Sequence, residues 1–352
     1  MTKPTILVTA ASGKTGGAVA RELLRQGWRV RALVHSDDQR ARDLKSLGAE
    51  LTVGDLFSAS DLRSAFQGVH RAYWCAPFHP EARKAALGFA EAAIAANVES
   101  IVNLSQWLAS ANHPSLLTRD SFATDLLFDS LAPRIAVTKL NPGFFADNYL
   151  RLIGFAAQLG ILPSLTGNSR NAPPSTEDIA RVAAACLMDP VAHAGRTYRP
   201  TGPDLLSTAD MARIIGSVLN RRVVRMEMPM WLFVKAARMQ GSNGVPPFEL
   251  SGFQYYINDH KAGAFERGAP TNDVWDVTGR PPESFGTIAA RYAARPETRR
   301  SLQSVARAWF DFMRTPMMPG YDLAGFERSV GAQPPERAVF AMNDAEWLSQ
   351  HQ

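Results

Sequence analysis

Apolar and polar positions alternate with two different periods along the first 140 residues. Short β-branched runs bounded by turns predict strands, and longer amphipathic stretches between them predict helices. The expected strands are Thr5–Thr9, Arg29–Val34, Glu50–Val53, Arg71–Cys75, Ser100–Leu104 and Ile135–Leu140. The expected helices are Gly17–Gln26, Gln39–Leu47, Ser60–Phe66, Pro80–Ala96 and Ser121–Leu131. This alternation predicts an α/β fold, a Rossmann-type doubly wound parallel sheet with helices on both faces.

The pattern changes after Leu140. The aromatic turn Asn141–Phe145 leads into short helices and Pro-rich turns, which predict a smaller, mostly helical lobe on the substrate side. Arg196–Pro200 is expected to return to the sheet as its last strand, and a further helix is expected at about Arg299–Arg314. The expected regions are a dinucleotide-binding domain over 1–140, the interleaved lobe over 141–295, and a C-terminal extension over 296–352 that is a lid, a subunit arm or a surface appendage.

Composition narrows the class of protein. A chain of 352 residues that is 46% hydrophobic can bury a large core, and a net charge of +5 is too mild to indicate a nucleic-acid surface. No apolar run reaches membrane-spanning length. Cys75 and Cys186 lack His or Cys neighbours at ligand spacing, so neither a disulfide framework nor a metal site is expected. The strand at Thr5 leaves no room for a signal peptide, and we expect a cytoplasmic protein.

The first strand opens directly into a loop with the spacing Ala10-x-x-Gly13-x-x-Gly16. In a Rossmann unit such a loop lets backbone N–H groups approach a pyrophosphate, which then faces the N-terminus of the next helix. Alanine fits the first glycine position if its φ is negative, and it raises the free energy of the folded loop if φ must be positive. The alternative is a structural turn that binds nothing. The loop residues expected to contact a dinucleotide are Ala10, Ser12, Gly13, Lys14, Thr15 and Gly16.

Residues after the other strands are expected at the same edge, because ligands of open α/β sheets bind beyond the carboxyl ends of the strands. Lys14, His35 and Arg40 favour the 2′-phosphate of NADP(H). Asp37 and Asp38 leave NAD(H) as the alternative cofactor, since a carboxylate there could accept a hydrogen bond from a ribose 2′-hydroxyl. The other cofactor contacts expected are Asp55 (or a turn cap), Leu56, Cys75, Ala76, Pro77, Ser105 (or a substrate contact) and Pro142.

Further segments carry a resemblance to a known family. They are Ala11–Gly16, Val30–Val34, Gly48–Leu56, Asn141–Asn148, Ser175–Ala180, Gly195–Tyr198, Thr201–Pro203 and Val277–Pro282. As a set they resemble the NmrA-like family of atypical short-chain dehydrogenase/reductases over about residues 4–294. The resemblance implies one of two functions. One is an NADPH-dependent reductase of quinones, triphenylmethane dyes, aromatic alkenes, enones or imines. The other is a non-catalytic NAD(P)-binding redox sensor that contacts a protein partner.

The acid/base residues of ordinary short-chain dehydrogenases are absent. None of the seven tyrosines has a lysine four residues on, and Ser121–Asp125 departs from the His-x-Ala-Thr-Glu pattern of dye reductases. Hydride transfer to an electrophilic acceptor can proceed without a dedicated acid, because the cofactor carries the chemistry. Ser105 and Thr124 remain the catalytic candidates, with Asp125 in a positioning or capping role.

An aromatic and apolar set of residues predicts a pocket for a small hydrophobic substrate, although such a stripe is also typical of a core. The residues expected to line it are Phe78, Trp107, Phe144, Phe145, Tyr149 and Trp231. We favour the reductase over the sensor. No nucleic acid, membrane or metal is expected as a partner, and a homodimer stays open.

Overall fold

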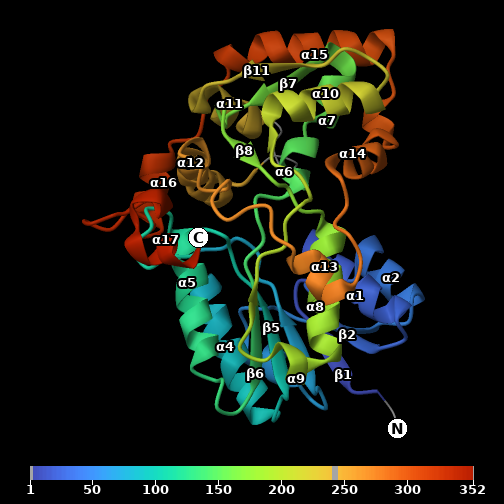
Figure 1. Cartoon of the computed structure of the whole chain (residues 1–352), viewed down its shortest axis with the longest axis vertical. Helices are drawn as coiled ribbons and strands as arrows, with labels where there is room; N and C mark the ends of the chain where they lie inside the picture. The colour runs from blue at the N-terminus through green and yellow to red at the C-terminus, as the bar shows by residue number, and fades with distance from the viewer. Residues whose placement is uncertain (1–2, 240–244, 352) are drawn as a thin grey trace.

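The computed structural model describes residues 3–239 and 245–351. Its lower half in Figure 1 contains a seven-stranded sheet in the order β3-β2-β1-β4-β5-β6-β9, with every neighbouring pair parallel. The strands are β1 (Thr5–Val8), β2 (Arg29–Val34), β3 (Glu50–Val53), β4 (Arg71–Trp74), β5 (Ser100–Leu104), β6 (Ala136–Leu140) and β9 (Thr197–Tyr198). The strand order reverses between β1 and β4, which is where such sheets bind ligands. The predicted doubly wound Rossmann fold is confirmed.

Alternate residues of each strand enter cores on opposite faces of the sheet. Ile6 and Val8 of β1 pack with α1 and α8 on one face, and Leu7 belongs to the core with α3, α4 and α5 on the other. The helices of this half are α1 (Lys14–Arg25), α2 (Gln39–Ser46), α3 (Ala59–Ala65), α4 (Ala82–Ala95), α5 (Leu116–Asp129), α8 (Thr176–Met188) and α9 (Pro190–His193). Both faces of the sheet are therefore covered.

Helix α5 begins at Leu116, earlier than the Ser121 expected from the sequence. Thr118 and Asp120 in its first turns are polar, yet they are only 0% and 5% exposed. The hydrophobic pattern therefore does not reveal these turns, which form because the helix packs against both α4 and α12.

Most of the chain after β6 forms a second lobe, in the upper half of Figure 1, with a core of its own that includes Phe144, Tyr149 and Phe285. Its strands pair as β7 (Ile161–Ser164) with β11 (Val224–Glu227) and β8 (Arg170–Asn171) with β10 (Leu206–Ser207). The helices of this part are α6 (Ala146–Leu150), α7 (Ile153–Leu159), α10 (Thr208–Val218), α11 (Met230–Met239), α12 (Pro247–Lys261) and α14 (Phe285–Ala293). Helix α13 (Asp273–Thr278) instead packs on α8 of the first half, and its Val274 belongs to the core there.

The C-terminal region runs from the top of the second lobe back down its side (Figure 1). Helix α15 (Leu302–Arg314) packs on α7, and α16 (Leu323–Ser329) packs on α12. Near the end of the chain, Trp347 of α17 (Ala345–Gln350) is only 1% exposed, and its indole N–H donates to the carbonyl oxygen of Trp107 over 2.9 Å. This last segment is thus part of the packed molecule. Short 3₁₀ turns occur at Pro296–Thr298, Thr315–Met317 and Ala341–Asn343.

Among the residues that the structure describes, no helix combines the length and apolar character needed to cross a membrane.

Candidate functional site

The loop after β1 is a tight turn that leads into α1. The N–H of Gly13 donates to the carbonyl oxygen of Ala10 over 2.8 Å, and the N–H of Gly17 donates to that of Gly13 over 3.0 Å. Ala10 has φ of +47°, in the left-handed region. Alanine at this glycine-like position therefore carries the strain that its methyl group imposes there, on the order of 1 kcal/mol.

Gly16 allows the first turn of α1 to lie directly on this loop. A Cβ atom at Gly16 would sit 2.5 Å from the carbonyl oxygen of Ala10 and 2.6 Å from that of Thr9. The N-cap residue Gly13 provides no side-chain hydrogen bond to the helix, so the first N–H groups of α1 have no such cap. Free N–H groups at a helix N-terminus, with the helix dipole behind them, favour an anion such as a pyrophosphate. These features fit a dinucleotide.

A cleft of about 410 Å³ extends from this loop along the strand ends and up to the second lobe. Its walls contain most of the residues that the sequence proposed for a cofactor or substrate. Those are Ala10, Gly13, Lys14, Thr15, Gly16, Cys75, Ala76, Pro77, Ser105, Thr124 and Pro142, and the aromatic residues Phe78, Trp107, Phe144 and Phe145. The structure thus brings together segments that are more than 100 residues apart in the chain.

Some of the proposed cofactor residues lie outside the walls of this cleft. His35 and Asp55 are exposed beyond the ends of β2 and β3, and Ser12 is half-buried in the loop. The carboxylate of Asp55 accepts from the N–H of Phe57 over 2.9 Å, which is the turn-forming role left open as its alternative. Leu56 is 8% exposed and belongs to the core beside α3 and α4.

Of the two tryptophans proposed for the pocket, Trp231 lies away from it and Trp107 lies in its wall. Trp231 lies on α11, is 55% exposed, and lines neither the cleft nor the smaller cavity described below. Trp107 does line the cleft, but it is 2% exposed and its indole N–H donates to the carbonyl oxygen of Ala264 over 2.9 Å. An aromatic side chain in the sequence does not show whether other segments cover it, so the sequence could not predict that Trp107 is buried and Trp231 is exposed.

Lys14 reaches across the cleft from α1. Its ammonium lies 3.3 Å from a carboxylate oxygen of Asp147, on α6 of the second lobe, and its side chain is 60% exposed. The carboxylate of Asp147 also accepts from the hydroxyl of Thr176 over 3.3 Å. The ion pair joins the two lobes, and the exposure of Lys14 leaves its ammonium accessible to an anion. Sequence reasoning missed Asp147, because only the fold brings α6 to the loop.

A buried polar cluster lies behind the cleft, where β5 meets α5. The carboxylate of Asp125 accepts from the hydroxyl of Ser105 over 2.7 Å and from the amide of Asn103 over 2.6 Å. Burial raises the pKa of Asp125 to about 7, although both hydrogen bonds act in the opposite direction. Ser105 and Asn103 line the cleft, whereas Asp125 does not. Thr124 also lines it, and its hydroxyl donates to the carbonyl oxygen of Asp120 over 2.8 Å.

Cys75 forms part of the floor of the cleft after β4. Burial raises the pKa of its thiol to about 12, so the sulfur is not a nucleophilic thiolate at neutral pH. Its backbone N–H donates to the hydroxyl oxygen of Thr9 over 2.9 Å. The contact links the ends of β1 and β4 and holds the floor in place.

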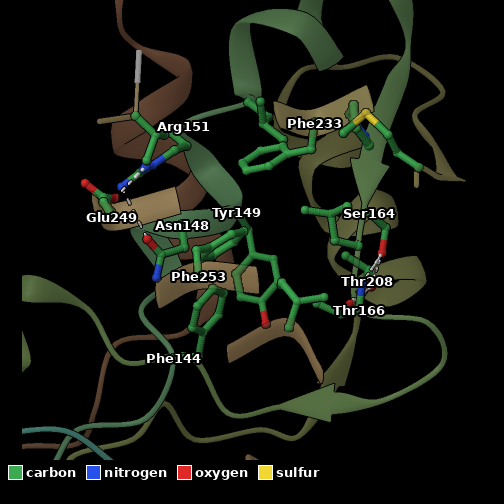
Figure 2. Close-up of a pocket in the computed structure, with 16 residues that line it drawn as sticks. Phe144, Asn148, Tyr149, Arg151, Ser164, Thr166, Thr208, Phe233, Glu249 and Phe253 are labelled. Carbon is green, nitrogen blue, oxygen red and sulfur yellow. Dashed lines mark hydrogen bonds and ion pairs between the residues drawn. The ribbon is translucent and has the colours of Figure 1, made fainter. Parts of the chain in front are cut away.

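A smaller cavity of about 50 Å³ lies next to the cleft, within the second lobe (Figure 2). Figure 2 shows Arg151 and Glu249 together on one side of it and the hydroxyls of Ser164, Thr166 and Thr208 on the other. The guanidinium of Arg151 lies 3.4 Å from the carboxylate of Glu249. The cleft and this cavity have common walls, formed by Phe144, Asn148, Arg151, Glu249 and Phe253.

Tyr149 lines this smaller cavity rather than the cleft. Its hydroxyl lies 2.7 Å from Nε2 of His260, whose Nδ1 lies 2.6 Å from the hydroxyl of Ser169. Burial raises the pKa of Tyr149 and lowers that of His260 to about 4, so both are neutral at physiological pH. This chain of hydrogen bonds satisfies polar atoms beneath the cavity wall.

Within residues 3–239 and 245–351, no group of three or more His, Cys, Asp or Glu side chains is arranged to hold a metal ion.

A model of the NmrA-like family matches residues 2–245. The chain is 27% identical over 293 residues to an NAD(P)H azoreductase of Xenophilus azovorans, covering 82% of this chain and 98% of that one. It is 29% identical over 296 residues to a (4-alkanoyl-5-oxo-2,5-dihydrofuran-3-yl)methyl phosphate reductase of Streptomyces griseus, with coverage of 82% and 98%.

Among solved structures, the fold is similar to that of the NADPH-dependent quinone oxidoreductase QOR2 of Escherichia coli complexed with NADPH. The TM-score is 0.69 at 20% sequence identity, and the match covers 81% of this chain and 99% of that chain.

Proposed function

Because the chain belongs to the NmrA-like family, we propose that it is an NADPH-dependent reductase that passes hydride to a hydrophobic, conjugated acceptor such as a quinone, dye, imine or enone. The observation that carries this proposal is the continuity of the cleft. One space of about 410 Å³ has the loop after β1 at one side and the aromatic side chains Phe78, Phe144 and Phe145 in its other walls. A cofactor and a flat apolar acceptor would therefore share one enclosure, as hydride transfer requires.

The residues present fit the cofactor at its charged and its reactive ends. The first N–H groups of α1 would bind the pyrophosphate, and Gly16 leaves the space that this approach needs, while the ammonium of Lys14 would pair with the 2′-phosphate of NADPH. Cys75–Pro77 would support the nicotinamide riboside. When bound in its reduced form, the cofactor supplies the hydride. The Oδ1 atom of Asn103 is buried at the cleft without a hydrogen-bond partner among the described residues, and it could accept from the carboxamide of the nicotinamide.

NADP(H) is favoured over NAD(H) because Asp38, one of the two acidic residues after β2, is already engaged. The carboxylate of Asp38 accepts from the N–H of Ala41 as the N-cap of α2, and it pairs with the guanidinium of Arg40 over 2.5 Å. The pairing with Arg40 and the hydrogen bond from Ala41 lower the pKa of Asp38, and together they engage both of its carboxylate oxygens. Asp37 is exposed and lies 3.7 Å from the guanidinium of Arg42. Its carboxylate is therefore accessible to a ribose 2′-hydroxyl, and binding of NAD(H) remains the alternative.

The acceptor would lie between the cofactor and the second lobe, with its far end directed at the smaller cavity. That cavity is lined by apolar side chains such as Phe233, Leu165 and Met228 and ends at three hydroxyls. The names of the relatives support a reductase of conjugated compounds, since one is an azoreductase and the other reduces an oxo-dihydrofuran phosphate.

The alternative is a redox sensor that binds the same cofactor without turnover and contacts a protein partner. It is favoured by one feature of the sequence, the absence of a lysine four residues after any of the seven tyrosines. A homodimer is compatible with either function.

A calorimetric titration of the purified protein with NADPH, NADP⁺, NADH and NAD⁺ tests these proposals first. It should be followed by measurement of cofactor oxidation with quinones, azo dyes, triphenylmethane dyes, enones and imines. Preference for NADPH over NADP⁺ and turnover of at least one acceptor class support the reductase. Tighter binding of oxidised cofactors without turnover of any acceptor would overturn it in favour of the sensor.

A further inference from the structure

We propose that Ser105 and Asp125 form a proton relay that gives the reduced acceptor its proton, with Ser105 as the immediate donor and Asp125 as the proton store behind it. The inference rests on the proposed reductase function. Reduction of a conjugated acceptor by hydride creates a basic atom that must be protonated. The lysine and tyrosine that ordinary short-chain dehydrogenases use for this are missing from the chain.

The position of Ser105 makes it the intermediary between Asp125 and the cleft. Ser105 follows β5 and lines the cleft, and its hydroxyl lies 2.7 Å from Oδ2 of Asp125. Asp125 lies on α5, is 7% exposed, and is not among the residues that line the cleft. A proton on this carboxyl group therefore passes to the cleft through the serine hydroxyl.

The hydrogen bond of Asn103 decides which oxygen of Asp125 carries the proton. The amide Nδ2 of Asn103 donates to Oδ1 over 2.6 Å, which keeps that oxygen an acceptor. The acidic proton then belongs on Oδ2, the oxygen that faces Ser105. When Asp125 is ionised, the O–H of Ser105 donates to Oδ2 and points away from the cleft. When Asp125 is protonated, Oδ2–H donates to the serine oxygen, and the serine proton is free to turn toward the acceptor.

The surroundings of Asp125 allow both forms near neutral pH. Lys139 on β6 lowers its pKa and Asp129 on α5 raises it, but these two side chains pair with each other over 2.8 Å, which limits the effect of either charge. Toward α4, the guanidinium of Arg83 pairs with Asp120 over 2.6 Å.

On the side of α12, the hydroxyl of Tyr256 donates to the side chain of Gln106. The nearby charges are therefore paired with one another, and burial is the largest influence on Asp125.

The transfer balances as follows. Hydride brings two electrons and one hydrogen to one atom of the acceptor, and the conjugated partner atom takes the proton from Oγ of Ser105. The proton on Oδ2 of Asp125 moves to the serine oxygen, which leaves Ser105 neutral and Asp125 ionised. Asp125 then regains a proton from water, so one turnover consumes one solvent proton and adds two hydrogens to the acceptor.

The first test is infrared spectroscopy of the full chain without cofactor. The band of a protonated carboxyl group should disappear with a midpoint near pH 7, and Asp125→Asn should remove it. Ser105→Ala should move the midpoint to higher pH, because the serine hydroxyl stabilises the ionised form. Ser121→Ala is the matched control. Its hydroxyl, on the same helix, donates to the carbonyl oxygen of Leu117 over 3.0 Å, and its loss should leave the band unchanged. A midpoint below about pH 5 would mean that Asp125 stores no proton, and the relay would be wrong.

The second test is the pH profile of kcat with saturating NADPH and an acceptor. Protonated Asp125 is the active form, so kcat should be highest below pH 7 and fall as the pH rises through it. Asp125→Asn and Ser105→Ala should each lower kcat by about 100-fold and flatten this limb, with KM for NADPH changed by less than about threefold. Wild-type turnover with unchanged kcat and profile in both variants would overturn the relay alone. If no acceptor is turned over by the wild-type protein, the proposed function fails and the relay fails with it.

Discussion

The two sides of the cleft are built in different ways. The loop after β1 uses backbone N–H groups and small residues that are neighbours in the sequence, with Gly13 and Gly16 only three residues apart. The wall opposite uses large aromatic side chains from distant segments, such as Phe144 and Phe253, whose rings pack against each other. Recognition of a dinucleotide can therefore be encoded locally, whereas the shape of the proposed acceptor pocket depends on the whole fold.

The largest effect on cofactor binding is expected from a charge in the loop after β1, the side of the cleft that is formed by residues close together in the sequence. Gly13→Asp places a carboxylate at the N-cap of α1, where it takes the position of the pyrophosphate and repels it. Two like charges about 4 Å apart repel by roughly 4 kcal/mol at an effective dielectric constant of 20, so cofactor binding should fall below detection. Calorimetric titration with NADPH measures the loss. Gly13→Ala is the matched control without the charge. An unchanged affinity of Gly13→Asp would remove this loop from the binding site.

A second change tests the wall that distant segments build. Trp347 is 1% exposed, and its indole N–H holds the backbone carbonyl of Trp107, a residue of the cleft. Trp347→Ala should lower the free energy of unfolding by about 4 kcal/mol, because it leaves a large cavity and an unpaired carbonyl group. Denaturant unfolding measures it. Trp275→Ala serves as the control, since Trp275 is 54% exposed and should matter little. Equal small effects would show that the C-terminal segment does not support the cleft.

The same contrast explains how far the sequence alone could lead. The loop with Ala10 and Gly16 was recognisable because strand, turn and helix follow one another within twenty residues. Trp231 was assigned to the pocket because it is aromatic, but only the packing of α11 shows that it is exposed. Asp125 could be suspected of a positioning role, yet its burial and its bond to Ser105 arise from the docking of α5 on β5. Residues whose role is set by a neighbour distant in the chain carry no local signal.

A fall in pH should destabilise the part of the fold that is built from distant segments more than the loop after β1. His260 joins Tyr149 and Ser169 beneath the smaller cavity, and burial lowers its pKa from 6.5 to about 4. The unfolded chain binds a proton at this histidine more readily than the folded chain does. Its neutral form therefore contributes stability above pH 6.5 that is lost as the pH falls to 4.

The contribution of His260 should be on the order of 3 kcal/mol to the difference between the unfolding free energies at pH 7.5 and pH 4. His260→Gln should reduce this difference by about that amount, and His35→Gln, at an exposed position, should leave it unchanged. Burial also lowers the pKa of His351 to about 4, and that histidine contributes equally in both variants. A pH dependence that is the same in both variants would show that His260 is not its source.

The smallest effect concerns Lys14, the residue through which the two sides of the cleft meet. Its ammonium is 3.3 Å from Asp147, but its side chain is 60% exposed, so it can turn to a phosphate when the cofactor binds. Lys14→Ala should weaken the binding of NADPH by about tenfold, or about 1.4 kcal/mol, and the binding of NADH by less, because only NADPH carries the additional phosphate. Asp147→Asn is the control, since it releases Lys14 without removing the ammonium and should preserve the preference for NADPH. Equal losses of NADPH and NADH in Lys14→Ala would mean that the lysine serves the pyrophosphate alone, and the choice between cofactors would then depend on the residues after β2.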